Sequence, residues 1–274
     1  MACISNRMFE SVASAVRGSG VDGVGGKLTL VTQTSTTSAS GLIINFIASS
    51  VTADWPVCLL TLHNTWGHYC NIGNKVGLNL RNQREQGTVK VVDGLQLVSG
   101  VIDAKGNCDD NHSFSFICKP LQYPLKNLYD NLKQTVHPWR ESGIQFQIIL
   151  EDVESLLHLG VRRKDIETFI HYCWNLVGKS PPSTVGSLVV VATIDEADED
   201  ANLLSHNMTH LASLHLSLHG LSTGPSREVH GLLRITALDR NCPNQCVPLI
   251  QNFQYKMEEK NMKLFAPGTS ANIL

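Results

Sequence analysis

Short apolar runs alternate with helical patterns from Lys27 to Asp200. Continuous apolar runs are typical of parallel strands that are covered on both faces. Five runs fit this description: residues 28–33, 56–63, 88–94, 144–152 and 187–195. The helical segments between them predict right-handed crossovers and a doubly wound α/β sheet.

Two connecting helices are marked by apolar stripes. Leucines at positions 121, 125, 128 and 132, with Val136, follow Pro124 near the first turn. A second stripe runs from Ile166 to Val177 and ends at Gly178. Both stripes are expected to face the core.

The pattern changes after Asp200. Leucines alternate with His215, Ser217 and His219 in residues 211–220, and residues 228–238, 252–259 and 261–268 continue as short strand patterns. These segments predict antiparallel strands that extend the parallel sheet. Strand and helix alternation followed by antiparallel strands outlines an α/β fold with a RecA-like, P-loop-type core.

The first 25 residues have a different texture. Apolar residues at positions 9, 12, 13 and 16 predict a short helix that ends at Gly18. Glycines 18, 20 and 23 match the dinucleotide-binding pattern, but that loop must follow a strand and open a helix. We expect a helix and a glycine-rich linker over 1–25 and a single RecA-like domain over 26–274.

Composition excludes a global basic field. The 274 residues are 42% hydrophobic and 17% charged, with a net charge of -2, so any nucleic-acid contact needs a local patch or a partner subunit. Eight cysteines lie mostly in apolar segments, and the sequence predicts neither a secretory signal nor a membrane span. We expect reduced thiols and a cytoplasmic or nuclear protein.

The layout around the first strand is that of a phosphate-binding loop. Such a loop needs glycines whose bare amides wrap the phosphates, a lysine that reaches the terminal phosphates and a hydroxyl that holds magnesium. After Gln33 the chain offers TSTTSASG, with Gly41 as its single glycine and no lysine between Lys27 and Lys75. Ser40 occupies the place of the magnesium hydroxyl. The sequence favours a hydroxyl-rich turn that caps the next helix, and a RecA-like domain without a functional Walker A motif.

Acidic residues follow two strands. Glu151 and Asp152 have the form of the acidic strand end that binds magnesium in RecA-type ATPases, although capping of the helix that starts near Val153 is favoured. Five carboxylates between Asp195 and Asp200 lack the ligand spacing and the glycine of a cation loop, so a solvated loop is expected.

Histidines and cysteines suggest metal sites without completing one. His206, His210, His215 and His219 cluster in sequence. On a strand, His215 and His219 share a face but stand about 13 Å apart. The two HYC triplets at 68–70 and 171–173 invite pairing, and Cys242 and Cys246 lack a second pair, so structural zinc is disfavoured.

Basic residues gather at Arg162–Lys164 and around a predicted hairpin with Arg227 and Arg234. Ordinary surface charge explains both groups. In a ring of RecA-type subunits, hairpin arginines can reach the phosphate site of a neighbour, which makes Arg227 a candidate that acts in trans.

Several stretches carry a family resemblance: residues 75–80 (KVGLNL), 149–160, 169–173 (FIHYC), 221–235 and 264–274. In this order they resemble the Elongator complex protein 6 family over residues 26–274. The resemblance implies a hexameric ring of two copies each of three related subunits, numbered four, five and six. It also implies tRNA binding through the ring, association with the catalytic Elongator subcomplex and support of wobble-uridine modification.

A ring subunit need not hydrolyse ATP, so no catalytic, cofactor-binding or metal-ligating residue is assigned and no cofactor is expected. The apolar segments 188–194 and 214–220 are expected to lie at sheet edges and to drive obligate hetero-oligomerisation. The alternative is an active RecA-type ATPase that uses a degenerate phosphate loop.

Overall fold

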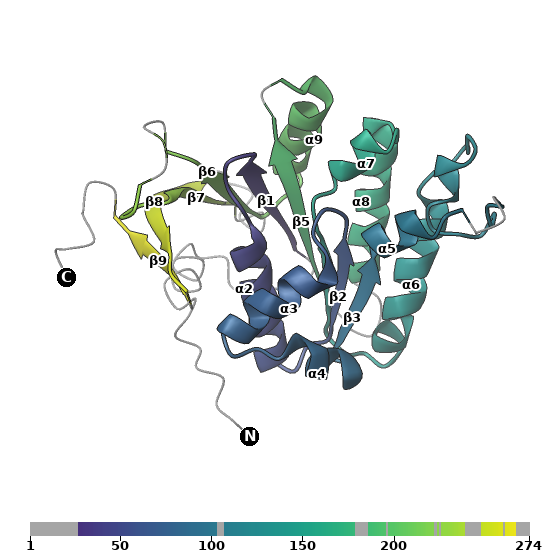
Figure 1. The fold of residues 1–274 in the computed structure, drawn as a ribbon, viewed down its shortest axis with the longest axis horizontal. Coiled ribbons are helices and arrows are strands. Elements are labelled where there is room, and N and C mark those ends of the chain that lie inside the picture. The colour runs from purple at the N-terminus through teal and green to yellow at the C-terminus, as the bar shows by residue number, and fades with distance from the viewer. Residues whose placement is uncertain are drawn as a thin grey trace.

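The described part of the chain forms one mixed sheet with helices on both faces (Figure 1). The computed structural model describes residues 27–102, 107–178, 186–195, 197–221, 224, 226–238, 248–259 and 261–266. The expected N-terminal helix, the linker, Cys242, Cys246 and residues 267–274 lie outside this part. The sheet has nine strands in the order β3-β2-β4-β5-β1-β6-β7-β8-β9.

The strands are β1 (Leu28–Thr34), β2 (Val57–Thr61), β3 (Val89–Asp93), β4 (Gln147–Leu150), β5 (Ser187–Ile194), β6 (Leu214–His219), β7 (Gly231–Ala237), β8 (Leu249–Met257) and β9 (Met262–Phe265). The five predicted parallel strands are confirmed as β1 to β5. Strands β7, β8 and β9 are antiparallel, as expected. The expectation for β6 was correct on one side only, because β6 pairs antiparallel with β7 but parallel with β1.

A crossover helix explains the direction of β6. The chain leaves β5, runs through α9 (Glu199–Thr209) and returns beside β1, so β6 continues the parallel sheet. Only the next connection, from β6 to β7, reverses the chain. An alternating polar pattern therefore marked a parallel strand whose polar side is partly buried, with His219 exposed at its end.

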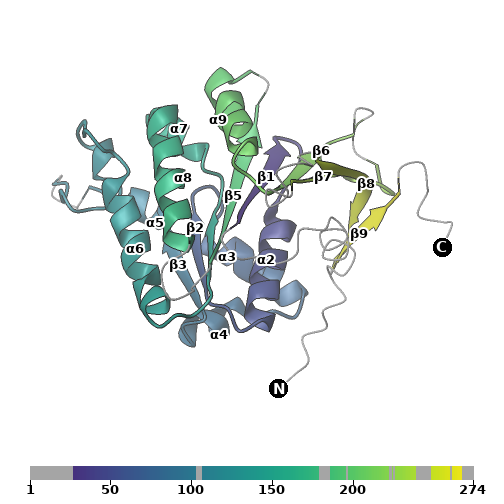
Figure 2. The same cartoon turned by 180° about the vertical axis from the view of Figure 1, so that it is seen from behind.

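Helices divide between the two faces. One face buries α6 (Lys126–Glu141), α8 (Arg163–Val177) and α9 in a core with the even-numbered residues of β1. The other buries α2 (Ser40–Thr52), α3 (Trp66–Lys75) and α4 (Leu80–Glu85). Short helices α5 (Gly94–Ser99) and α7 (Ser155–His158) and the 3-10 turn η2 (Ser115–Ile117) complete the described elements. Figure 2 shows the α6, α8 and α9 side.

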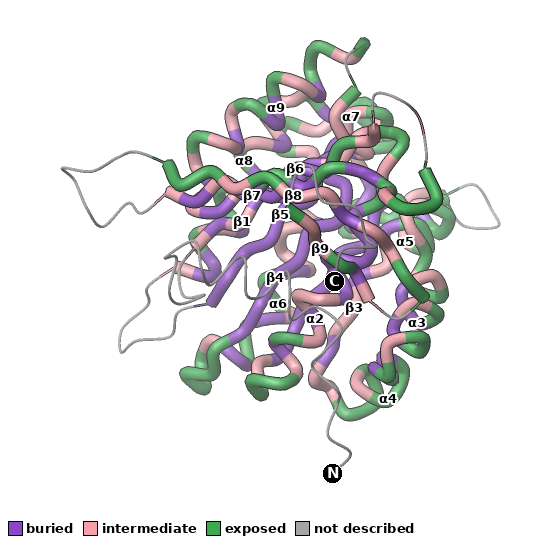
Figure 3. The backbone as a smooth tube through the Cα atoms, turned by 90° about the vertical axis from the view of Figure 1, so that its left-hand side faces the viewer, coloured by how far each residue is buried: buried purple, intermediate pink, exposed green. Residues whose placement is uncertain are grey.

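The sheet edges differ from the sequence expectation. Residues 188–194 lie in β5, between β4 and β1, and residues 214–219 lie in β6, between β1 and β7. Both expected edge segments are therefore interior strands, and their apolar character reflects burial on the sheet. The tube in Figure 3 is buried along these strands and exposed along the outer faces of the helices. The edges are β3 and β9.

The two predicted connecting helices are confirmed with shifted starts. Helix α6 begins at Lys126, after Pro124, and continues through Pro138 to Glu141. Helix α8 begins at Arg163 and ends before Gly178. Among the described helices, none combines the length and the apolar composition needed to cross a membrane.

Candidate functional site at the carboxyl edge of the sheet

The predicted strand-turn-helix joint is confirmed between β1 and α2. Its turn is closed by its own hydroxyl groups. The backbone N–H of Thr34 donates to Oγ1 of Thr37 (2.9 Å), and that hydroxyl donates back to the carbonyl of Thr34 (3.1 Å). The turn is a compact hydrogen-bonded unit rather than a loop of bare amides.

Two amides at the start of α2 are bound by nearby side chains. The N–H of Ala39 donates to Oε1 of Gln33 (2.5 Å), and the N–H of Ser40 donates to Oγ of Ser38 (3.3 Å). The expected hydroxyl cap is thus correct for Ser38 only, since the N-cap residue Ala39 has no capping side chain. Gln33, which the sequence did not single out, blocks an amide that a phosphate would need.

Ser40 does not offer a free hydroxyl. It is buried, and its Oγ lies 2.9 Å from Nε2 of His68 on α3 and accepts a 3.1 Å hydrogen bond from Ser38. The adjacent Gly41 lies under Met257 of β8, where a Cβ would stand 2.9 Å from the methionine Cε. Protein groups therefore contact both Ser40 and Gly41 in the first turn of α2.

The carboxylate of Glu151 receives hydrogen bonds from a second loop. Donors come from the backbone N–H groups of residues 62, 63 and 64 (2.8 to 3.0 Å), from Nδ2 of Asn64 (2.7 Å) and from the hydroxyl of Tyr69 (2.7 Å). Glu151 is 2% exposed. Burial, and next the charge of Glu151, raises the pKa of Tyr69. Glu151 thus anchors the loop between β2 and α3, with its oxygens occupied by protein donors.

Asp152 also lies at the carboxyl edge of the sheet, but its partners are side-chain hydroxyls rather than backbone amides. Its φ angle is 52°, a left-handed conformation that aspartate tolerates better than most residues. Its carboxylate accepts from Oγ1 of Thr193 (2.6 Å) and from Oγ of Ser155 (2.8 Å), and lies 3.6 Å from Nδ1 of His63. The expected N-cap role was wrong, because the N-cap of α7 is Glu154. Asp152 binds the hydroxyl of Ser155 instead.

Thr193 links three strands at this edge. Its hydroxyl accepts from Nε2 of Gln33 on β1 (3.0 Å), and its N–H donates to Oε2 of Glu154 (2.9 Å). Burial, followed by repulsion from Asp152, raises the pKa of Glu154 to about 8. The helices after β1 and β5 leave toward opposite faces, which makes this crevice the topological switch point where α/β sheets bind ligands. In this protein the crevice is filled by the hydrogen bonds of Thr193 with Gln33, Asp152 and Glu154.

The acidic run from Asp195 to Asp200 is partly helical. Asp198 is the N-cap of α9, and its carboxylate accepts from the N–H of Ala201 (3.0 Å). Glu199 and Asp200 lie in the first turn, where their negative charge stabilises the positive end of the helix dipole. The exposed positions of Asp195, Glu199 and Asp200 agree with the expected solvation, but the second half of the run begins a helix instead of continuing a loop.

His215 and His219 lie on one face of β6 and bind different hydroxyls, as their predicted separation requires. Nε2 of His215 lies 2.8 Å from Oγ1 of Thr32, and Nε2 of His219 lies 2.7 Å from Oγ of Ser217. Burial, followed by repulsion from His219 and Arg234, lowers the pKa of His215 to about 4. Both histidines belong to a polar network of the sheet.

The other metal suggestions also separate in space. The two HYC triplets lie on α3 and α8, which cover opposite faces of the sheet. His206 and His210 lie one turn apart on and just after α9, with Nε2 atoms 3.3 Å apart. Within the described ranges, no group of three or more His, Cys, Asp or Glu side chains is placed to hold a metal ion.

The basic groups have different surroundings. Arg162 binds Asp165 (2.7 Å), and Arg163 binds both Glu167 (2.5 Å) and Asp200 (3.3 Å) at the start of α8. Arg227 is exposed in the connection between β6 and β7, as predicted. The ion pairs of Arg162 and Arg163 stabilise the start of α8, whereas the exposed Arg227 is accessible to another molecule.

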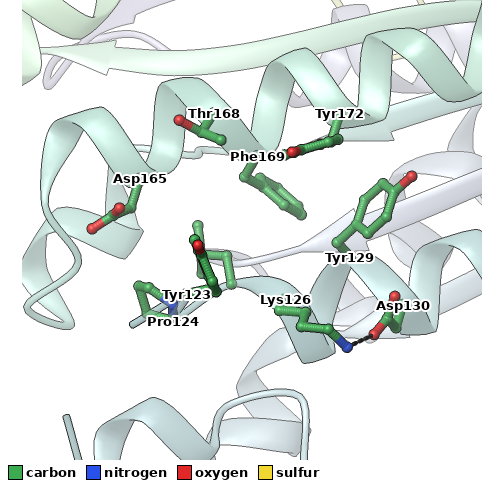
Figure 4. A pocket seen from close by; sticks show the side chains of 10 residues that line it. Tyr123, Pro124, Lys126, Tyr129, Asp130, Asp165, Thr168, Phe169 and Tyr172 are labelled. Carbon is green, nitrogen blue, oxygen red and sulfur yellow. Dashed lines mark hydrogen bonds and ion pairs between the residues drawn. The ribbon is translucent and has the colours of Figure 1, made fainter. Parts of the chain in front are cut away.

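A separate hollow of about 290 Å³ lies between α6 and α8 and has aromatic walls (Figure 4). Tyr123 and Tyr172 are 65% and 54% exposed, while Phe169 is buried behind them. The rim carboxylates are already paired, Asp130 with Lys126 (2.6 Å) and Asp165 with Arg162. This hollow is an apolar surface feature away from the β1 to α2 turn.

Comparisons with known proteins cover most of the chain. The family model described as "Elongation complex protein 6" matches residues 9–259. The chain is 30% identical over 259 residues to Elongator complex protein 6 of Homo sapiens, covering 91% of this chain and 93% of the relative. It is 31% identical over 279 residues to the Xenopus tropicalis protein of that name (97% and 100% covered) and 24% identical over 212 residues to the Drosophila melanogaster one (77% and 78%).

Proposed function

The chain belongs to the Elongator complex protein 6 family, and from this membership we propose that it is a noncatalytic subunit of a hetero-hexameric RecA-like ring. Its partners there are the sister Elongator subunits four and five. The ring binds tRNA and supports the catalytic Elongator subcomplex in wobble-uridine modification. This work takes place in the cytoplasm and the nucleus.

The state of the carboxyl edge carries the noncatalytic part of the proposal. A RecA-type ATPase needs free amides and a lysine for the phosphates, and a carboxylate for magnesium and water. Here Gln33 and Ser38 bind the first amides of α2, and Glu151 is occupied by five protein donors. ATP would have to displace several buried hydrogen bonds, each of which is costly to lose.

A face of β7 and β8 that the described helices leave open supports assembly. Leu232 of β7 and Ile250 of β8 lie on the same face, because they are paired with Gln254 and Thr236 in the ladder. They are 42% and 43% exposed, and the described helix nearest to this face, α9, lies over β5 and β1. Four ladder positions, about 13 Å, separate them, so this face offers two separate apolar contact points to a partner rather than one continuous patch.

The charge distribution supports tRNA binding by the ring rather than by this chain alone. The net charge is -2, and carboxylates gather at the start of α9. Phosphate contacts therefore depend on local cations such as Arg227 and on the sister subunits.

Co-expression with subunits four and five tests the proposal. We expect a complex whose native mass equals two copies of each subunit, and tRNA binding by that complex that weakens steeply as salt rises. A monodisperse chain that binds neither sister subunit contradicts the assembly role. A complete ring whose tRNA affinity is absent or independent of salt contradicts the RNA role alone.

A further inference from the structure

Strand β3 leaves one side of its backbone without a strand partner. Within the described residues it pairs with β2 only, and it forms one end of the sheet. An edge strand presents N–H and C=O groups that another chain can bind. Figure 1 shows β3 as the last strand on its side, with α4 and α5 near its two ends.

A hollow of about 650 Å³ follows this edge. Every residue of β3 lines it, and its walls come from the end of α4, from α5 and from α6. Leu97 on α5 and Thr135 on α6 contribute to these walls. The edge is therefore recessed, with room for a single extended segment beside the strand.

The amino end of the hollow is cationic. Arg84 lies 5.8 Å from the ring centre of Trp66, and Nζ of Lys90 donates to the carbonyl of Thr135 (3.2 Å), 4.8 Å from the ring centre of Trp139. Within the part of the chain that the structure describes, neither cation forms an ion pair with a carboxylate. A segment that places an acidic side chain here gains an opposite charge.

At the other end, Asp93 is already used by the protein. Its carboxylate accepts from the N–H of Gln96 (3.0 Å) as the N-cap of α5. The charge of the hollow is thus unequal, with two cations at the start of β3 and one committed carboxylate at its end. This asymmetry gives a bound segment a preferred orientation.

We propose that β3 is a strand-addition site that takes an extended segment of another Elongator subunit, with an acidic residue beside Arg84 and Lys90. The identity of the donor rests on Elongator membership. Main-chain hydrogen bonds along β3 provide affinity, and the apolar walls and cations select the side chains of the segment. A second copy of this chain fits poorly, because two equally recessed edges cannot approach each other.

Amide hydrogen exchange tests the site in the full chain and in its complex with subunits four and five. We expect the β3 amides that point away from β2, and only those, to exchange at least tenfold more slowly in the complex than in the chain alone. Gly100 lines the hollow and has room for a side chain, since an added Cβ would stand 3.4 Å or more from other atoms. The variant Gly100→Trp fills the hollow and should remove the added protection. Gly67→Trp, at an exposed position of α3, should leave it intact.

A charge reversal provides a second test. Arg84→Glu should reduce the added protection of β3, whereas Arg81→Glu on the same helix, outside the hollow, should not. Equal exchange of the outward-pointing β3 amides in chain and complex, or their protection already in the isolated chain, overturns the inference and leaves assembly intact. Failure to form any complex overturns the proposed function and removes the donor segment with it.

Discussion

The hydroxyl of Tyr69 donates a 2.7 Å hydrogen bond to the carboxylate of Glu151, across 82 positions of the chain. The bond joins α3 to the end of β4 and completes the set of five donors around Glu151. A residue in the place of a magnesium ligand thereby fixes the path of the chain after β2.

Replacing Glu151 with Ala should destabilise the protein by about 3 kcal/mol or more, because several buried donors would lose their acceptor. Tyr69→Phe should cost about 1.5 to 3 kcal/mol, since a single hydrogen bond to a buried carboxylate is lost. Urea unfolding monitored by circular dichroism measures both. The exposed Glu85→Ala is the control and should change stability little. A neutral Glu151→Ala would mean that the network does not hold the loop.

The pKa of Glu154 gives stability a pH dependence at neutral pH. Its folded pKa is about 8, well above the ordinary value of about 4.3. Between these values the unfolded chain releases a proton that the folded chain retains, so the contribution of Glu154 falls as pH rises toward 8. Glu154→Gln, which retains an oxygen for the N–H of Thr193, should flatten this decline. Unfolding midpoints at pH 7 and pH 8.5 measure it, and parallel declines in both proteins contradict it.

His215 should act in the acidic range with the opposite slope. Its folded pKa of about 4 lies below the ordinary value of about 6.5, so the unfolded chain binds a proton first as pH falls. Its contribution to stability is complete above pH 6.5 and is lost as pH falls toward 4. His215→Asn should reduce the acid sensitivity of the unfolding midpoint. If the unfolding midpoint of His215→Asn falls with acid as steeply as that of the unchanged protein, the destabilising proton binds to a group other than His215.

The sequence predicted what depends on local pattern. The apolar runs identified β1 to β5, and the missing lysine and glycines identified a phosphate loop without its chemistry. It did not predict the parallel direction of β6 or the interior position of β5, because both depend on where the crossover through α9 returns.

The hydrogen-bond partners were also beyond the sequence. Gln33, Thr193 and Tyr69 come from segments far apart in the chain, and only the order of strands brings them to one edge. The polar residues directly after β2, such as Asn64, were a usable signal, since parallel strands end at the same edge.

Arg227 offers a test of cooperation between subunits. It is exposed between β6 and β7, and we propose that it reaches the phosphate site of a neighbour. Arg227→Ala should then lower nucleotide turnover by the assembled ring at least tenfold. Lys133→Ala, an exposed cation on α6, should not. Unchanged nucleotide turnover in a complete ring that carries Arg227→Ala contradicts this role.

The most direct test of a noncatalytic subunit is calorimetric titration of the isolated full chain with ATP and magnesium. The two amides bound at the start of α2, the missing lysine and the committed carboxylate of Glu151 predict no saturable binding up to about 1 mM, corresponding to a binding free energy weaker than about -4 kcal/mol. Magnesium-dependent binding in the micromolar range would contradict the account.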